Sequence, residues 1–289
     1  MELISTIVIQ ILNALVFSGM LLLCAIGLTM IFGIMGVVNF AHGSFYMLGA
    51  YVAYTSVVAL HNFWLALIIA PISVGIVGAL LEVTTLRRIY AKEHWVAFLL
   101  TFGFLVFIDS SIQAIWGPQF KRVPYPEMFS GSIKILGQTY PVYNLFIVCV
   151  AVVVAAGVLI ALQRTRLGLN IRAVSQNSVM AGAIGINVKM VRTFVFGLGC
   201  ALAALSGVVV APIVAVTLGM GVSFLVQSFA VVVVGGLGSI IGSVVGSLII
   251  GTSQTLGTFI LPEGAMVFMY VLMAGILIFR TRGLFGEGE

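Results

Sequence analysis

The sequence predicts an all-α, polytopic transmembrane helical bundle, and three observations carry that prediction. Of the 289 residues, 62% are hydrophobic and only 7% are charged, and the mean hydropathy is +1.26. A soluble domain, in which about 25% of residues are charged, could not cover its surface with so few polar groups. The apolar runs are long and lack the alternating polarity of a β-barrel, so each must satisfy its backbone hydrogen bonds as a helix.

The individual spans follow from length, because a membrane-spanning helix needs about 20 mostly apolar residues. The glycine-rich stretch near 33–43 and the join at 235–239 interrupt the pattern and predict broken or re-entrant helices there. We therefore expect eight or nine spans, at 7–33, 43–60, 63–86, 95–117, 141–163, 194–215, 222–238, 240–260 and 265–280.

The basic residues predict how these spans are oriented, since short cytoplasmic loops carry an excess of Lys and Arg. Three basic clusters lie at 87–92, 164–192 and 280–282. With nine spans all three face the cytoplasm, which places the N-terminus outside and the C-terminus inside. The loop at 118–140 would then lie outside, although it holds three basic residues against one acidic residue. We therefore interpret the net charge of +5 as setting the orientation of the spans in the membrane. We expect no nucleic-acid partner.

Several enzymatic chemistries have no counterpart in the sequence. No lysine follows a glycine, so the P-loop of nucleotide hydrolases is missing. The run at 231–239 resembles a dinucleotide-binding turn, but its third glycine is displaced to Gly242 and the next acidic residue is Glu263. No Cys, Asp or Glu near His42 completes a metal site, and no paired carboxylates or nucleophile–base set stand out. We expect a transport subunit without metal or cofactor.

Polar residues and glycines mark the two predicted breaks. Asn39 and His42, spaced i,i+3, could hold a broken helix against its neighbour. Together with Gly43 they could instead border the solute path, because polar groups at membrane depth tend to face a cavity. Gly235 and Gly236 could unwind the second break, as in transporters that build sites at the membrane midplane.

A stripe of small residues follows the second break. Gly238, Gly242 and Gly246 recur every four residues, and a serine follows each of them. On a helix this stripe lets another backbone approach closely inside the membrane, so we expect it to serve helix packing.

Acidic residues inside the spans are few. Asp109 is the only one in the middle of a span, and we expect it to pack near the outer end, facing protein or water. Glu82 lies near the cytoplasmic boundary, where pairing with Arg87 and Arg88 is expected.

The loop at 163–193 predicts a contact with another protein. A short helix with exposed apolar residues and few charges suits a groove on a partner, while a helix lying on lipid is the alternative. A polar N-cap opens this helix and a glycine is placed to end it. The residues predicted to form the contact are Gln176, Asn177, Ser178, Met180, Ala181, Ala183, Ile184 and Gly185.

Six motifs in register give the chain a family resemblance. They are Asn-Phe-Ala-His-Gly at 39–43 with 47–51, Trp-Gly-Pro at 116–118, Thr-Arg-Leu-Gly at 165–168, the stretch 173–187, Gly-Gly-Leu-Gly-Ser at 235–239 and Arg-Gly-Leu-Phe-Gly at 282–286. From about residue 10 to 286 the chain resembles the bacterial branched-chain amino acid ABC permeases of the LivH type.

That resemblance implies a single permease domain over 1–289 in the bacterial inner membrane, which translocates branched-chain or related amino acids. It also implies a second, homologous permease, two ABC ATPase subunits that hydrolyse ATP, and a periplasmic solute-binding protein. Residues 176–186 would be the helix that couples to the ATPase, and Ser44 stands where many relatives carry a carboxylate. Similar permeases serve urea, short amides or aromatic acids, and an ATP-independent channel or secondary transporter is the rival class.

Overall fold

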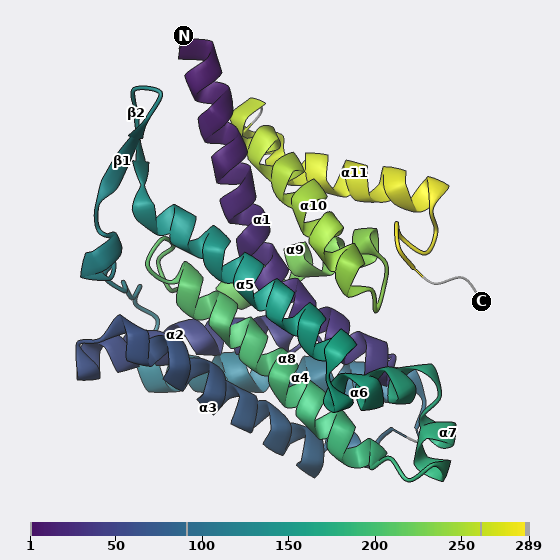
Figure 1. Cartoon of the computed structure of the whole chain (residues 1–289). Helices are drawn as coiled ribbons and strands as arrows, with labels where there is room; N and C mark the ends of the chain where they lie inside the picture. The colour runs from purple at the N-terminus through teal and green to yellow at the C-terminus, as the bar shows by residue number, and fades with distance from the viewer. Residues whose placement is uncertain (1, 91, 261, 287–289) are drawn as a thin grey trace.

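The computed structural model describes residues 2–90, 92–260 and 262–286, which form an almost wholly helical bundle (Figure 1). Its α-helices are α1 (Glu2–Met35), α2 (His42–Leu60), α3 (Phe63–Thr84), α4 (His94–Trp116), α5 (Val142–Arg164), α6 (Arg166–Gln176), α7 (Ser178–Ala183), α8 (Val188–Val210), α9 (Met220–Gly235), α10 (Ile240–Ile260) and α11 (Ala265–Phe279). Three single-turn 3₁₀ helices join them, η1 (Leu86–Arg88), η2 (Glu127–Phe129) and η3 (Pro262–Gly264). The predicted all-α class is confirmed.

One small element was not expected from the sequence. The strands β1 (Ser132–Ile135) and β2 (Gln138–Pro141) pair antiparallel, with Ile135 opposite Gln138. Leu136 and Gly137 form the two-residue turn between them, and both have positive φ, 48° and 84°. Such a turn matches the twist of the flanking strands, which explains a hairpin here despite the bulky leucine.

The number of spans depends on α9. Eight helices in the described chain are long and apolar enough to cross a membrane. The remaining predicted span, 222–238, corresponds to α9, whose 16 residues reach about 24 Å against about 30 Å of bilayer core. It ends at Gly235, three residues before its predicted end. The prediction of eight or nine spans is confirmed, with α9 as the short one.

The first predicted break turns the chain back into the bundle. After α1 the chain reverses at Gly36, whose φ is +63°. His42, the first residue of α2, then contacts the carbonyl of Cys24, eleven residues before the end of α1. That distance corresponds to a depth of about 16 Å. Helix α2 therefore begins well inside the bundle, and the segment 36–41 is re-entrant.

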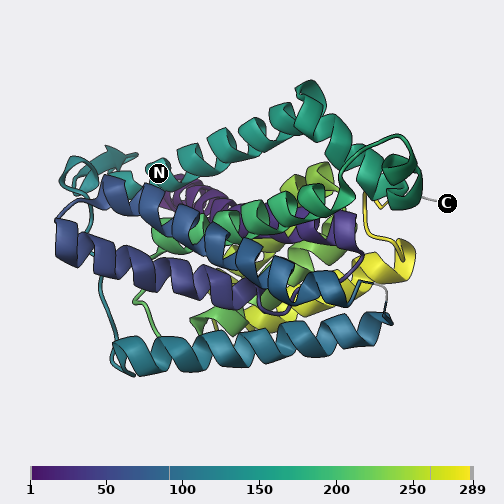
Figure 2. The same ribbon diagram turned by 90° about the horizontal axis from the view of Figure 1, so that it is seen from below.

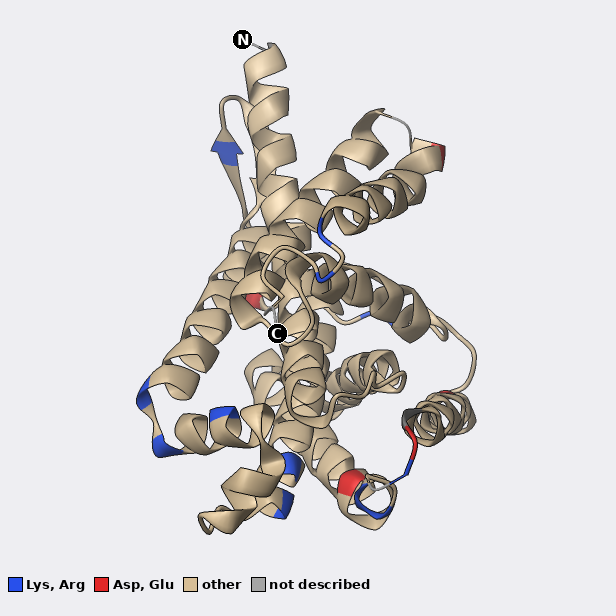
Figure 3. Cartoon of the chain, turned by 90° about the vertical axis from the view of Figure 1, so that its right-hand side faces the viewer, with Lys and Arg blue, Asp and Glu red and all other residues tan. Residues whose placement is uncertain are grey.

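The basic clusters gather at one end of the bundle, which we call the basic end. Three contacts join its segments: Arg87 to Thr193, Ser175 to Gly33, and the backbone of Leu284 to that of Val234. The hairpin lies at the opposite end, the hairpin end, and Figure 2 shows it at the left of the bundle with α6, α7 and the C-terminal segment at the right. Figure 3 shows Lys and Arg in blue around α6 and α7, and also on the hairpin, where Lys134 lies in β1. The basic residues at the basic end are Arg87, Arg88, Lys92, Arg164, Arg166, Arg172, Lys189, Arg192, Arg280 and Arg282.

Helices α1 and α8 form the centre of the bundle. In their most apolar stretches 83% and 67% of residues are buried, compared with 17% in α5 and 11% in the α11 span. Small residues allow the central helices to pack this closely. For example, a Cβ at Gly207 of α8 would overlap the carbonyl oxygen of Tyr46 in α2. Among the outer helices, α4 packs chiefly on α2.

Candidate functional site

The predicted contact segment is two short helices at the basic end. Thr165 accepts a hydrogen bond from the Gly168 amide at the start of α6, at 3.0 Å. Asn177 separates α6 from α7 and caps α7, because its Oδ1 accepts from the amides of Val179 and Met180 at 3.1 and 2.9 Å. Gly185 ends the segment with φ +91°. The predicted cap and stop are confirmed.

Helix α7 has an exposed apolar side and an anchored side. Val179 is 82% exposed and Ile184 70%, and Met180 is also largely exposed. Ala181 is only 2% exposed because it packs in a cluster with Val174 and residues of α1 and α8. Ala181 was predicted to meet a partner directly. Its side chain instead anchors α7 to the bundle in this structure, and its contact with a partner stays a prediction.

Most other residues predicted for this contact are accessible. Gln176, Asn177, Ala183 and Gly185 are exposed, and Ser178 is partly buried. The segment therefore offers a partner mainly apolar contacts, framed by a few uncharged polar groups.

A buried carboxylate joins the chain after α7 to the α3–α4 connection. Glu82 is fully buried and accepts hydrogen bonds from Thr193 Oγ1 at 2.6 Å and from the Tyr90 hydroxyl at 2.9 Å. Arg87 forms an ion pair with it at 3.3 Å and also donates to Thr193. The Arg192 guanidinium lies 4.7 Å from the Tyr90 ring centroid. This network fixes the first turns of α8, which α7 precedes.

The first break is held by its polar residues. Asn39 Oδ1 accepts from the amide of Ala41 at 3.1 Å, and His42 Nε2 donates to the carbonyl of Cys24 in α1 at 3.0 Å. Both side chains are buried. His42 thus holds the broken helix against its neighbour, one of the two roles the sequence suggested. Its role in a solute path stays a prediction.

The starts of α2 and α9 meet inside the bundle. A Cβ at Gly43 would overlap the Gly221 carbonyl oxygen, and a Cβ at Gly221 would lie 2.5 Å from the Gly43 carbonyl oxygen. Neither helix start is capped by a side chain. Only glycine permits this approach of two helix N-termini, each of which carries a partial positive charge.

Asp109 lies next to this meeting point. Its carboxylate accepts a hydrogen bond from Ser44 Oγ at 2.6 Å, which links the middle of α4 to the first turn of α2. Asp109 is partly exposed. The sequence suggested packing for Asp109 but gave no partner, since Ser44 is 65 positions away.

The second break lies against the end of α1. Gly236 has φ +106° and follows the last residue of α9, Gly235, as predicted. Gly238, with φ +86°, lies in the turn before α10, and a Cβ added to it would lie 3.5 Å from the Cα of Gly33. Its assignment to the helical stripe is wrong, because α10 begins only at Ile240.

The remaining stripe glycines do pack helices. A Cβ at Gly242 would overlap the Gly235 carbonyl, and one at Gly246 would overlap the Val231 carbonyl, both in α9. Beside them, the hydroxyls of Ser243 and Thr29 lie 2.5 Å apart and join α10 to α1. The packing interface predicted from the spacing is therefore present between α9 and α10.

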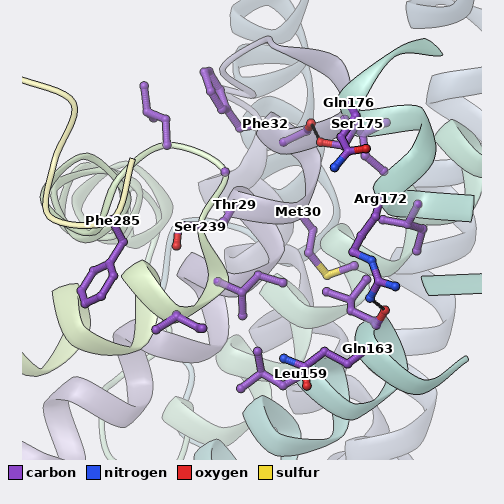
Figure 4. A pocket seen from close by; sticks show the side chains of 18 of the residues that line it. Thr29, Met30, Phe32, Leu159, Gln163, Arg172, Ser175, Gln176, Ser239 and Phe285 are labelled. Atoms are coloured by element: carbon purple, nitrogen blue, oxygen red, sulfur yellow. Dashed lines mark hydrogen bonds between the residues drawn. The ribbon is translucent and has the colours of Figure 1, made fainter. Parts of the chain in front are cut away.

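A cavity of about 700 Å³ opens at the basic end, between α1, α5, α6 and the α9–α10 turn. Figure 4 shows Arg172 and Gln163 on one side of it and Ser239 and Phe285 on the other. Ser175 donates a hydrogen bond to the carbonyl of Gly33 at its rim, at 2.5 Å. The sequence did not predict this cavity, since its walls come from three segments that are far apart in the sequence, α1, α5 with α6, and the α9–α10 turn.

Comparison with known proteins identifies the family to which this chain belongs. A family model described as branched-chain amino acid transport system / permease component matches residues 10–277. The chain is 28% identical to the high-affinity branched-chain amino acid transport system permease protein BraD of Pseudomonas aeruginosa, over 97% of this chain and 96% of BraD. It is 27% identical to the corresponding LivH proteins of Escherichia coli K12 and Salmonella typhimurium, with the same coverage. With its many apolar helices, the chain is a multi-pass inner-membrane transport permease and belongs to the family of branched-chain amino acid transport system permease components.

Proposed function

We propose that this chain is the membrane-spanning permease subunit of an ABC importer for branched-chain amino acids. Two ATPase subunits supply the energy, a second homologous permease completes the membrane channel, and a periplasmic binding protein delivers the solute. The names and full-length coverage of the relatives support this proposal. The missing P-loop supports a separate chain for ATP hydrolysis.

The proposal that α7 couples the permease to the ATPase rests on the exposed apolar side of this helix. In the proposed complex, Val179, Met180 and Ile184 occupy a groove on the ATPase, as an amphipathic helix does in helix-in-groove recognition. When the ATPases close, α7 moves, and the network around Glu82 and Thr193 transmits this movement to α3 and α8. The basic end then faces the cytoplasm and includes the C-terminus.

The proposed solute path runs beside the starts of α2 and α9. The polar pair Ser44 and Asp109 supports this assignment, because a carboxylate inside a span is expensive unless it meets water, protein or solute. Asp109→Asn should therefore reduce solute uptake. Ser111→Ala, which removes a hydroxyl bonded only within α4, should leave uptake unchanged. Equal uptake by both variants and the wild type would exclude Asp109 from the path.

The coupling proposal is tested by a charge on α7. Ile184→Asp places a carboxylate in the proposed groove without disturbing the bundle, because Ile184 is exposed. We expect the purified variant to lose co-elution with the ATPase subunits and ATP-driven uptake of leucine in proteoliposomes. Ala181→Asp is unsuitable, since it would also disrupt the packing that anchors α7.

The matched control is Leu136→Asp, at an exposed leucine in the turn at the hairpin end. This variant should keep both ATPase binding and uptake. If Ile184→Asp retains the ATPase and transports normally, α7 is not the coupling helix. Leucine flux through the chain reconstituted alone without ATP would instead favour a channel or secondary transporter.

A further inference from the structure

The cavity at the basic end is large enough for a ligand. Its volume of about 700 Å³ lies within the range of roughly 300–1,000 Å³ that is typical of small-molecule sites. It is lined by residues 29–34 of α1 and 159–163 of α5, which belong to the last two turns or so of these helices. The cavity therefore lies within about 9 Å of the helix ends, at the depth where lipid headgroups meet acyl chains.

One part of the cavity is apolar and faces the side of the bundle. Met30, Leu159, Leu162 and Ile240 contribute to this part. Helix α5 packs on α1 and α6, and α10 packs on α1, α9 and α11, whereas α5 and α10 are not a packed pair in the described residues. In the residues that the structure describes, α5 and α10 make at most a few contacts, so the side of the cavity between them is where an acyl chain would enter from the bilayer.

The other part holds an unneutralised cation. Arg172 of α6 donates to the carbonyl of Leu162, which uses only part of a guanidinium with five N–H donors. The stretch 164–192 contains no acidic residue, and the ion pair found among the described residues is the distant one of Arg87 with Glu82. The planar fork of arginine matches the oxygens of a phosphate group.

We propose that this cavity binds an anionic phospholipid. Its phosphate contacts Arg172, with Gln163 and Ser175 nearby as polar groups, and one acyl chain lies along Leu159 and Ile240 (Figure 4). A basic pocket between helices at the cytoplasmic surface is the arrangement that recognises anionic headgroups in other membrane proteins.

The bound lipid would contact moving parts of the molecule. Arg172 and Ser175 belong to α6, which leads directly into α7, while Gly33 and Gly238 mark the α1 end and the α9–α10 turn. The lipid would thus link the contact segment to both helix breaks. The binding site itself does not depend on the solute or on ATP coupling.

The test measures lipid retention by the full-length chain purified with its transporter subunits. The complex is incubated with phosphatidylglycerol or phosphatidylcholine and analysed by native mass spectrometry. We expect phosphatidylglycerol to be retained several-fold more strongly than phosphatidylcholine. Arg172→Gln should reduce phosphatidylglycerol retention about tenfold, the effect of losing roughly one charge-assisted contact. Leu159→Trp should reduce it too, because the indole fills the acyl part of the cavity.

The matched control is Arg166→Gln, which removes the same charge from α6 at a position that does not line the cavity. It should retain phosphatidylglycerol like the wild type. Equal retention by wild type and Arg172→Gln, or of both lipids, would overturn the proposal. Glycerol phosphate competing as well as phosphatidylglycerol would show a small-anion site instead. Retention by the chain only after its ATPase subunits are removed would show that a protein fills the cavity in the complex.

Discussion

At the scale of single residues, the hydroxyl of Tyr90 has a defined electrostatic role outside the membrane spans. Burial, and then the negative charge of Glu82, raise the pKa of Tyr90 well above its usual value of about 10. The hydroxyl therefore stays protonated and donates to Glu82 throughout the physiological range. Because the folded-state pKa is the higher one, this stabilisation is fully present below about pH 10 and is lost as the pH rises through the folded-state value.

Tyr90→Phe should lower the free energy of unfolding by about 1.5–3 kcal/mol, the usual contribution of a hydrogen bond to a charged group. The difference from wild type should be constant between about pH 6 and 9 and shrink above about pH 10. Denaturant titrations of the purified protein at several pH values measure it. Tyr270→Phe, at an exposed tyrosine of α11, is the control and should show no difference. A difference that grows with pH would contradict this assignment.

Residue partners were predictable only where they are close in the chain. Pairing of Glu82 with Arg87 follows from a spacing of five residues, and the Asn177 cap follows from its position before a short apolar helix. Thr193 is 111 residues from Glu82, and no spacing rule connects the two. The bond of Ser44 to Asp109 was hidden for the same reason, since it requires knowing that α2 lies along α4.

At the scale of helices, the close backbone contact between α2 and α8 can be tested by adding a methyl group to a glycine in it. Gly207 faces the backbone of Tyr46, and a Cβ at Gly49 would overlap the backbone of Ala204. Gly207→Ala should force these helices apart and cost about 1–3 kcal/mol, as overpacking usually does. Gly157→Ala on α5 meets no atom within 4 Å and should be neutral or slightly stabilising, because alanine favours helices by about 1 kcal/mol.

Thermal unfolding of the two variants in the same detergent makes this comparison. Equal stability of Gly207→Ala and Gly157→Ala would mean that α2 and α8 are not in backbone contact. The sequence could predict that α10 packs closely on another helix, since Gly242 and Gly246 share one helical repeat, but it did not identify that helix as α9. It could not predict the α2–α8 contact, because a single glycine becomes informative only when its neighbour is known.

At the scale of the whole molecule, the two ends of the chain lie at opposite ends of the bundle. The N-terminal end of α1 lies with the hairpin and the C-terminal segment lies with α7. Eight long apolar helices together with the shorter α9 are consistent with this arrangement. Apolar run length was sufficient to predict this threading, because only helices can satisfy their backbone in lipid. The depth at which α2 begins was not predictable, since it depends on His42 reaching Cys24.

The side of the membrane that each end faces is the last prediction, and it follows from charge. The basic end carries three clusters of Lys and Arg, so it should face the cytoplasm, with the C-terminus. After replacement of the three native cysteines, Val179→Cys and Leu136→Cys provide one exposed thiol at each end. A membrane-impermeant maleimide should label Leu136→Cys in intact spheroplasts and Val179→Cys only in inverted vesicles. The cysteine-free chain should not react in either. The opposite pattern would reverse the orientation and place α7 where no cytoplasmic ATPase could reach it.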